Sequence, residues 1–190
     1  MGVRAAIVLA AGASQRMGAP KALLPWADST LLGYALEQLA LAGVTSPVVV
    51  LGLGHEEIAA HVPRLAQAVV ALNLDEASGR SGSIRIGAAA VVAGATAVIV
   101  QSVDQPCPAR VLMALYEANA EVAVPTFEGR RGHPVCFSSA LLAELRAVTE
   151  AELGLRAVVK RHLVRDVAVT SPAVLLNLND PESYSSARIS

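Results

Sequence analysis

The chain has 190 residues, of which 54% are hydrophobic, 3% aromatic and 16% charged, and its formal net charge is −1. High hydrophobicity with little net charge excludes an intrinsically disordered chain. A chain that is not basic overall has no global positive field for nucleic acid, so we expect no nucleic-acid partner. The two cysteines, Cys107 and Cys136, are too few for a disulfide scaffold and fit no zinc pattern, so we expect buried thiols and a reducing compartment.

Strands and helices alternate over the first two-thirds of the chain. Continuous apolar runs predict buried strands at residues 5–10, 47–51, 68–72, 97–100 and 122–124. Helical spacing of apolar residues, with caps and stops, predicts helices at residues 30–43, 56–65, 83–92 and 108–119. This alternation indicates a doubly wound sheet covered by helices on both faces.

The pattern loosens after Phe127. We predict a turn at residues 128–132, then a strand at 134–137 that we expect to pair antiparallel. Further elements are expected as helices at 140–148, 154–162 and 181–187 and as extended runs at 165–169 and 173–176. The whole predicts one α/β domain over residues 1–190, a three-layer α/β/α, Rossmann-like arrangement. Its sheet is mostly parallel, with a small antiparallel portion in the C-terminal third.

No apolar run reaches the roughly 20 residues that span a bilayer. The short apolar stretch at residues 3–11 leads directly into a polar loop rather than a signal-peptide cleavage site. We therefore expect a soluble, cytoplasmic protein with no membrane partner.

The loop after the first strand, residues 9–21, combines small residues with two cations, Arg16 and Lys21. Small residues let the backbone approach a ligand, and successive N–H groups can form an anion-binding concavity. This chemistry suits a polyphosphate, although the loop is neither a P-loop nor a dinucleotide fingerprint. The alternative is a small-residue turn with two solvated cations.

Two further loops follow buried strands, and we expect both to lie at the same edge of the sheet as the first loop. In the first, Asn73 offers a donor and an acceptor to a nucleobase or ribose, and Ser83 would cap a helix that welcomes an anion. Ser83 could equally be a cap only. In the second, Asp104 offers a hard oxygen ligand for Mg²⁺, the alternative being a cap of the next turn.

The stretch Leu-Ala-Ala-Gly-x-Ser-x-Arg-Met-Gly-x-x-Lys at residues 9–21 resembles the signature loop of the MobA-like nucleotidyltransferases, the family of molybdenum cofactor cytidylyltransferase and molybdopterin guanylyltransferase. The resemblance implies a fold of the nucleotide-diphospho-sugar transferase type, with catalytic Arg16 and Lys21 on the phosphates and catalytic Asp104 on Mg²⁺. The nucleotide-binding residues it implies are Leu9, Ala10, Ala11, Gly12, Ser14, Asn73 and Ser83. Ala11 resembles the cytidylyltransferases, since guanylyltransferases usually carry glycine there.

The resemblance continues through the C-terminal third. Gly-His-Pro-Val at residues 132–135 is similar to a family segment near the acceptor, which implies that His133 contacts the acceptor. The stretch that carries Glu152 and Arg156 is similar to Gly-Asp-x-Gly-x-Arg, another implied acceptor contact, but with Ala151 and Glu152 in place of the glycine and the aspartate. Asn179 falls where relatives have a second metal ligand.

The implied reaction is Mg²⁺-dependent transfer of a nucleotidyl group to an acceptor phosphate, with release of pyrophosphate. The expected substrates are CTP, in preference to GTP, and a molybdopterin-type acceptor, and a molybdoenzyme or cofactor-delivery protein is the expected partner. Two alternatives remain open. One is a nucleotidyltransferase with another acceptor, of the guanylyltransferase or sugar-phosphate type, and the other is a non-enzymatic module that binds the nucleotide or the molybdenum cofactor.

Overall fold

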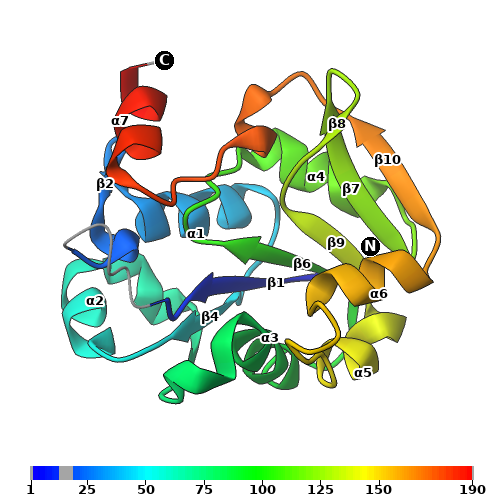
Figure 1. Cartoon of the computed structure of the whole chain (residues 1–190), viewed down its shortest axis with the longest axis horizontal. Coiled ribbons are helices and arrows are strands. Elements are labelled where there is room, and N and C mark those ends of the chain that lie inside the picture. The colour runs from blue at the N-terminus through cyan, green and yellow to red at the C-terminus, as the bar shows by residue number, and fades with distance from the viewer. Residues whose placement is uncertain (1, 13–18, 190) are drawn as a thin grey trace.

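The computed structural model describes residues 2–12 and 19–189, and one long sheet runs through it (Figure 1). The sheet strands are β1 (Val3–Ala10), β4 (Val48–Leu51), β5 (Val69–Leu72), β6 (Ala95–Ser102), β7 (Val122–Phe127), β8 (Arg130–Arg131), β9 (Val135–Ser138) and β10 (Val164–Ala168). Their order is β10–β7–β9–β6–β1–β4–β5, and β8 pairs with β7 outside this path. A separate two-stranded ribbon is formed by β2 (Pro25–Trp26) and β3 (Ser29–Thr30).

The sheet is parallel except around β8 and β9. β1 pairs in parallel with β4 and β6, β4 with β5, and β10 with β7. β9 is antiparallel to both of its neighbours, β6 and β7, and β8 is antiparallel to β7. The prediction of a mostly parallel sheet with an antiparallel portion in the C-terminal third is therefore confirmed.

Helices cover both faces of the sheet (Figure 1). One face carries α1 (Leu31–Leu41), α2 (His55–His61) and α4 (Ala109–Glu117), and the other carries α3 (Gly79–Ala89), α5 (Leu142–Leu145) and α6 (Leu155–Arg161). The alternation of side chains along β1 explains the two cores, since Ala6 and Val8 join the first and Ile7 and Leu9 the second. The last helix, α7 (Pro181–Ile189), lies beside the ribbon, where the Tyr184 hydroxyl donates to the carbonyl of Pro25.

Several element predictions differ from the structure in type or bounds. The helix predicted at 83–92 begins at Gly79, so Ser83 lies inside it and does not cap it. The run at 173–176 is part of a 3-10 helix, Pro172–Leu175, rather than extended. The helix predicted at 56–65 is interrupted at Val62, because Pro63 cannot continue an α-helix and instead opens a 3-10 turn.

Packing explains the early start of α3. Glycine and serine are weak helix formers, so this stretch reads as a loop on propensity alone. Gly87 of this helix lies so close to β1 that a Cβ there would overlap Ile7, and Ser81, Gly82 and Ser83 are buried. Close packing against the sheet therefore stabilises a helical conformation here that intrinsic helix propensity does not favour.

The carboxyl ends of β1, β4, β5 and β6 lie at one edge of the sheet, because these strands are parallel. Two backbone hydrogen bonds gather distant segments there. The N–H of Val103 donates to the carbonyl of Leu9 at 3.0 Å, and the N–H of Leu178 donates to the carbonyl of Asp104 at 2.9 Å. Within the described part of the chain, no helix has the length and apolar character needed to cross a membrane.

Candidate active site

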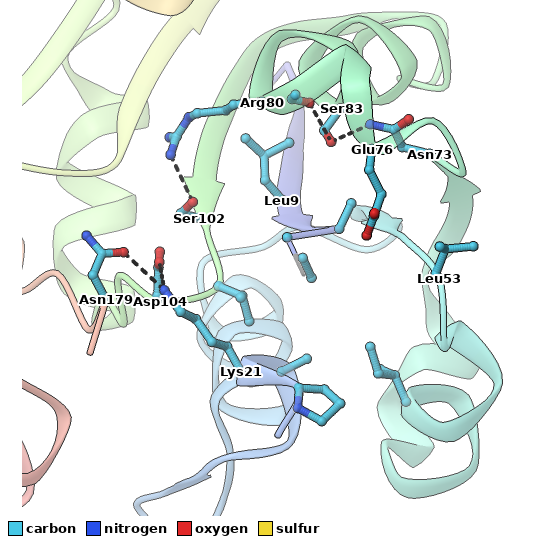
Figure 2. A pocket seen from close by; sticks show the side chains of 18 of the residues that line it. Leu9, Lys21, Leu53, Asn73, Glu76, Arg80, Ser83, Ser102, Asp104 and Asn179 are labelled. Carbon is cyan, nitrogen blue, oxygen red and sulfur yellow. Dashed lines mark hydrogen bonds and ion pairs between the residues drawn. The ribbon is translucent and has the colours of Figure 1, made fainter. Parts of the chain in front are cut away.

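A pocket of about 820 Å³ opens at this edge of the sheet (Figure 2). Its lining comes from the ends of β1 and β6 and from the loops that follow them, from the start of α3, and from the segment before α7. The predicted site residues that line it are Leu9, Ala10, Ala11, Gly12, Lys21, Asn73, Ser83, Asp104 and Asn179. The predicted residues Ser14 and Arg16 lie outside the described residues.

Lys21, Asp104 and Asn179 meet at one side of the pocket, which we call the Asp104 corner. The ammonium of Lys21 donates to Asp104 Oδ2 at 2.7 Å and to Asn179 Oδ1 at 3.0 Å. The side chains of Lys21 and Asp104 are 16% and 14% exposed, so a ligand in the pocket can reach both. Three segments that are 83 and 158 residues apart in sequence are thus joined by one side chain.

Local structure explains why these side chains meet. Lys21 begins a short 3-10 turn, Lys21–Leu23, that is anchored by buried Ala22. Asp104 follows β6 in a turn closed by a hydrogen bond from the N–H of Gln105 to the carbonyl of Ser102. Asn179 follows Leu178, whose side chain is 1% exposed in the core. Each functional side chain is therefore adjacent to a fixed backbone position.

The Asp104 corner fits a divalent cation. A carboxylate oxygen and an amide oxygen converge on one point, now taken by the Lys21 ammonium, and hard oxygen ligands of this kind suit Mg²⁺ or Mn²⁺. Among the described residues no cluster of three or more His, Cys, Asp or Glu side chains could hold a metal ion. A cation here would complete its coordination with phosphate oxygens and water, as Mg²⁺ commonly does.

Asn73, Ser78 and Ser83 form the opposite side, which we call the Asn73 corner. The Asn73 amide is 5% exposed and lies 2.9 Å from Ser83 Oγ and 3.1 Å from Ser78 Oγ. Its hydrogen-bonding groups are thus engaged with neighbouring hydroxyls, although it lines the pocket. A Cβ at Gly82 would overlap Ser78 Oγ, so the Ser78 hydroxyl fills the space in which a side chain at 82 would stand.

The N-terminus of α3 already holds an anion from the chain itself. The carboxylate of Glu150 accepts a hydrogen bond from the N–H of Ser81 at 2.6 Å. Gly79, with φ +59°, permits this approach, because a Cβ there would lie 3.1 Å from the same carboxylate oxygen. The expectation that Ser83 caps this helix was wrong, and Glu150 takes one of the first-turn N–H groups that the expectation left to a ligand anion.

Arg80 is a pocket residue that the sequence did not indicate. It lies in the first turn of α3 and donates from Nη1 to Ser102 Oγ, at the end of β6, at 3.1 Å (Figure 2). Partial withdrawal from water lowers the pKa of its guanidinium, an effect opposed by the nearby carboxylates of Asp104 and Glu150. Arginine at the start of a helix is common on protein surfaces, and only the contact with Ser102 distinguishes this one.

The predicted acceptor residues are only partly brought together. His133 lies near Arg80, Asp104 and Arg156, and burial, followed by the charge of Arg80, lowers the pKa of its imidazole. Its segment is fixed by a hydrogen bond from the His133 N–H to the carbonyl of Val174, which comes so close that a Cβ at residue 132 would overlap it. Close packing against Val174 thus explains the glycine at position 132, and the backbone hydrogen bond holds His133 in place.

Glu152 lies apart from this group. It is exposed, and its carboxylate accepts a hydrogen bond from Thr149 Oγ1 at 3.4 Å within its own loop. Glu150, two residues earlier, is the carboxylate that reaches α3. The structure therefore does not join Glu152 to the pocket, whereas Arg156 of the same segment lies close enough to influence His133.

Both cysteines are free and buried, as predicted. Burial raises the pKa of the Cys107 and Cys136 thiols to about 12, so both are protonated at neutral pH. Neither lines the pocket, which leaves them as small apolar core residues.

Comparisons with known proteins agree with this architecture. Residues 6–167 match the family model described as the MobA-like NTP transferase domain. The chain is 30% identical over 165 residues to nicotine blue oxidoreductase of Paenarthrobacter nicotinovorans, an alignment that covers 79% of this chain and 78% of the relative.

Solved structures give the same result. The crystal structure of Rv0371c from Mycobacterium tuberculosis H37Rv superimposes with a TM-score of 0.87 at 29% identity, covering 100% of this chain and 99% of the other. The complex of Rv0371c with manganese gives a TM-score of 0.82 at 27% identity, with the same coverage of 100% and 99%. The fold is thus of the nucleotide-diphospho-sugar transferase type, as the resemblance implied.

Proposed function

The chain belongs to the MobA-like NTP transferase family, a family of nucleotidyltransferases, and from this premise we propose that it transfers a cytidylyl group from CTP to the phosphate of a molybdopterin-type acceptor. The observation that carries the proposal is the Asp104 corner, where a lysine, a carboxylate and an amide oxygen converge at the rim of a pocket large enough for a nucleotide. A module that only binds a nucleotide would not need this arrangement.

The reaction follows from this geometry. An oxygen of the acceptor phosphate attacks the α-phosphorus of CTP, the bond between the α-phosphorus and its bridging oxygen breaks, and pyrophosphate leaves with the electron pair. Mg²⁺, bound by Asp104 and Asn179, would supply neutralisation of the phosphate charge. As phosphates enter, the Lys21 ammonium can exchange its contacts with these residues for oxygens of the leaving pyrophosphate.

No general base is needed, since a phosphate monoester is already ionised at pH 7 and attacks as an anion. His133 agrees with this, because its lowered pKa leaves the imidazole neutral at that pH. A neutral imidazole beside the acceptor can orient it through a hydrogen bond. Catalysis is then positioning and charge neutralisation by the chain's own residues.

CTP is the proposed nucleotide because of Ala11. Gly52 lies under this residue, where a Cβ would come 2.6 Å from the Ala11 carbonyl, so the backbone around Ala11 is closely packed. The Ala11 methyl should therefore crowd a guanine more than a cytosine. One such contact discriminates by about ten- to two-hundredfold. We expect Ala11→Gly to relax the preference for CTP over GTP without reversing it.

A pyrophosphate-release assay with CTP, GTP, ATP and UTP tests the proposal, with molybdopterin cofactor and sugar 1-phosphates as acceptors. We expect release with CTP and molybdopterin cofactor. Release with a sugar phosphate alone would change the acceptor, and a GTP preference would change the nucleotide. Reduction of nicotine blue without any pyrophosphate release would contradict nucleotidyl transfer and favour the activity for which the Paenarthrobacter relative is named.

A further inference from the structure

Two arginines, Arg80 in the pocket and Arg156 on α6, form no ion pair among the described residues. The guanidinium of Arg80 donates to the neutral hydroxyl of Ser102, and the part of the chain that the structure describes offers neither Arg80 nor Arg156 a carboxylate at ion-pair distance. Several other arginines pair with a carboxylate, as in Arg64 with Glu37, Arg131 with Asp166 and Arg161 with Glu144, or donate to a backbone carbonyl, as in Arg4 with Ala42, Arg85 with Val148 and Arg146 with Ala88.

The two guanidinium groups lie close enough to influence each other. Each also acts on His133, and both lower the pKa of its imidazole, while Arg80 itself lines the pocket and is held at Ser102. Two positive charges near each other repel. The carboxylates of Asp104 and Glu150 oppose this repulsion at Arg80 but form no ion pair with it, so an anionic ligand would stabilise the arrangement further. The arrangement is therefore typical of a receptor for a multiply charged anion.

The position of Arg80 separates this region from the triphosphate loop. Its guanidinium is held at Ser102, two residues before Asp104, whereas Lys21 approaches Asp104 from the first loop (Figure 2). Arg80 also lies close enough to His133 to influence the pKa of its imidazole. Asp104 thus stands between two cationic groups that come from different elements. Lys21 is therefore positioned to bind the nucleotide, and Arg80 is positioned to bind the second substrate, which reacts with the nucleotide.

We propose that Arg80 is an acceptor-specificity residue, which binds the phosphate dianion of the acceptor together with Arg156 and so selects phosphate monoesters over neutral alcohols. This inference rests on the proposed nucleotidyl transfer for the identity of the second substrate. The planar guanidinium can hold two phosphate oxygens at once while Ser102 keeps it oriented. The phosphate would then be fixed beside Asp104, where its third oxygen can face the α-phosphorus.

Binding of inorganic phosphate to protein saturated with α,β-methylene-CTP tests Arg80 without any turnover. We expect titration calorimetry to show at least a tenfold weaker affinity for phosphate in Arg80→Gln, with the affinity for the CTP analogue within about twofold of that of the unaltered protein. Arg80→Lys should retain part of the phosphate affinity, because it keeps the charge and loses the fork. Arg64→Gln, which removes the same charge from an exposed pair with Glu37, should change neither affinity.

The outcomes separate the two proposals. Equal losses of phosphate and nucleotide affinity in Arg80→Gln would assign Arg80 to the triphosphate and overturn the inference. Unchanged phosphate affinity in this variant would overturn it as well, and so would the absence of measurable phosphate binding to the unaltered protein. Failure of pyrophosphate release with every acceptor would overturn nucleotidyl transfer but leave this binding result standing. Circular-dichroism melting of each variant identifies loss of fold, and Arg80→Lys, which keeps the charge, remains decisive if Arg80→Gln does not fold.

Discussion

The two corners of the pocket differ in how their polar groups are satisfied. In the Asp104 corner, charged side chains contact one another through an ion pair that a substrate can exchange, with Lys21 2.7 Å from Asp104. In the Asn73 corner, neutral groups bind one another under nearly complete burial, and Asn73 is 5% exposed. The first arrangement suits charge that moves during a reaction, and the second suits a wall whose shape must not change.

This difference predicts different consequences of mutation. Changes in the Asp104 corner should act on the rate and leave the free energy of unfolding nearly unchanged, because a partly exposed ion pair contributes about 1 kcal/mol or less. Changes in the Asn73 corner should act on stability and nucleotide affinity, because a buried polar group that loses its partner costs about 1–3 kcal/mol. The following variants test this division, from the largest expected effect to the smallest.

Asp104→Ala should lower turnover by about a thousandfold or more, equivalent to roughly 4 kcal/mol of transition-state stabilisation. The variant loses the carboxylate that would hold the metal ion but no core packing, since Asp104 lies in a loop. Asp104→Asn should lose at least about tenfold. Steady-state pyrophosphate release measures both, and Asp166→Ala, which breaks an exposed pair with Arg131 at 2.7 Å, is the control. Near-normal turnover in Asp104→Ala would remove this residue from the site.

Lys21→Ala should lower the maximal rate by about a hundredfold and weaken CTP binding less. Negative charge on the leaving pyrophosphate grows in the transition state, so the ammonium is worth more there than in the ground state. Single-turnover rates and the dissociation constant of CTP, measured separately, give the split, with Lys160→Ala on exposed α6 as the control. If affinity alone falls, Lys21 is a ground-state clamp and the two corners do not differ as stated.

Asn73→Ala should lower the free energy of unfolding by about 1–3 kcal/mol and weaken CTP binding, with the rate at saturation less affected. The substitution leaves the hydroxyls of Ser78 and Ser83 without their shared partner in the buried corner. Urea denaturation of Asn73→Ala, Ser83→Ala and the double variant measures the coupling between the two side chains. Strictly additive losses would contradict a corner that acts as one hydrogen-bonded unit.

Local signals in the sequence were enough for Lys21 and Asp104, whereas Asn179 came only from the family resemblance. The strand before the first loop is a continuous apolar run, and Asp104 follows a second such run, so Lys21 and Asp104 could be placed together from the topology of parallel strands. The register of β1 and β6 confirms that placement, with Leu9 opposite Ser102.

The remaining features depend on contacts that no local pattern encodes. Arg80 acquires its position from Ser102, 22 residues away, and the N-terminus of α3 is occupied by Glu150, 69 residues beyond Ser81. The start of α3 itself depends on the burial of serine and glycine against the sheet, which opposes their intrinsic propensity. Tertiary contacts made by long side chains, such as Arg80 with Ser102 and Glu150 with Ser81, could therefore not be predicted from the sequence.

The pH dependence of stability is the smallest expected effect, and it tests the charge of the region around Arg80. Burial and the charges of Arg80 and Arg156, opposed by Asp104, lower the pKa of His133 below its usual 6.5. Below pH 6.5 the unfolded chain therefore takes up a proton at this residue that the folded chain does not, and stability falls as the pH decreases toward the folded pKa. The slope from one histidine cannot exceed about 1.4 kcal/mol per pH unit.

We expect the difference in unfolding free energy between the unaltered protein and His133→Asn, measured by urea denaturation in metal-free buffer, to shrink between pH 7.5 and pH 5.5. A difference that grows as the pH falls would mean that the folded protein holds a proton on His133. Negative charge would then outweigh the two guanidinium groups near this residue, and the region would not be suited to bind an anion.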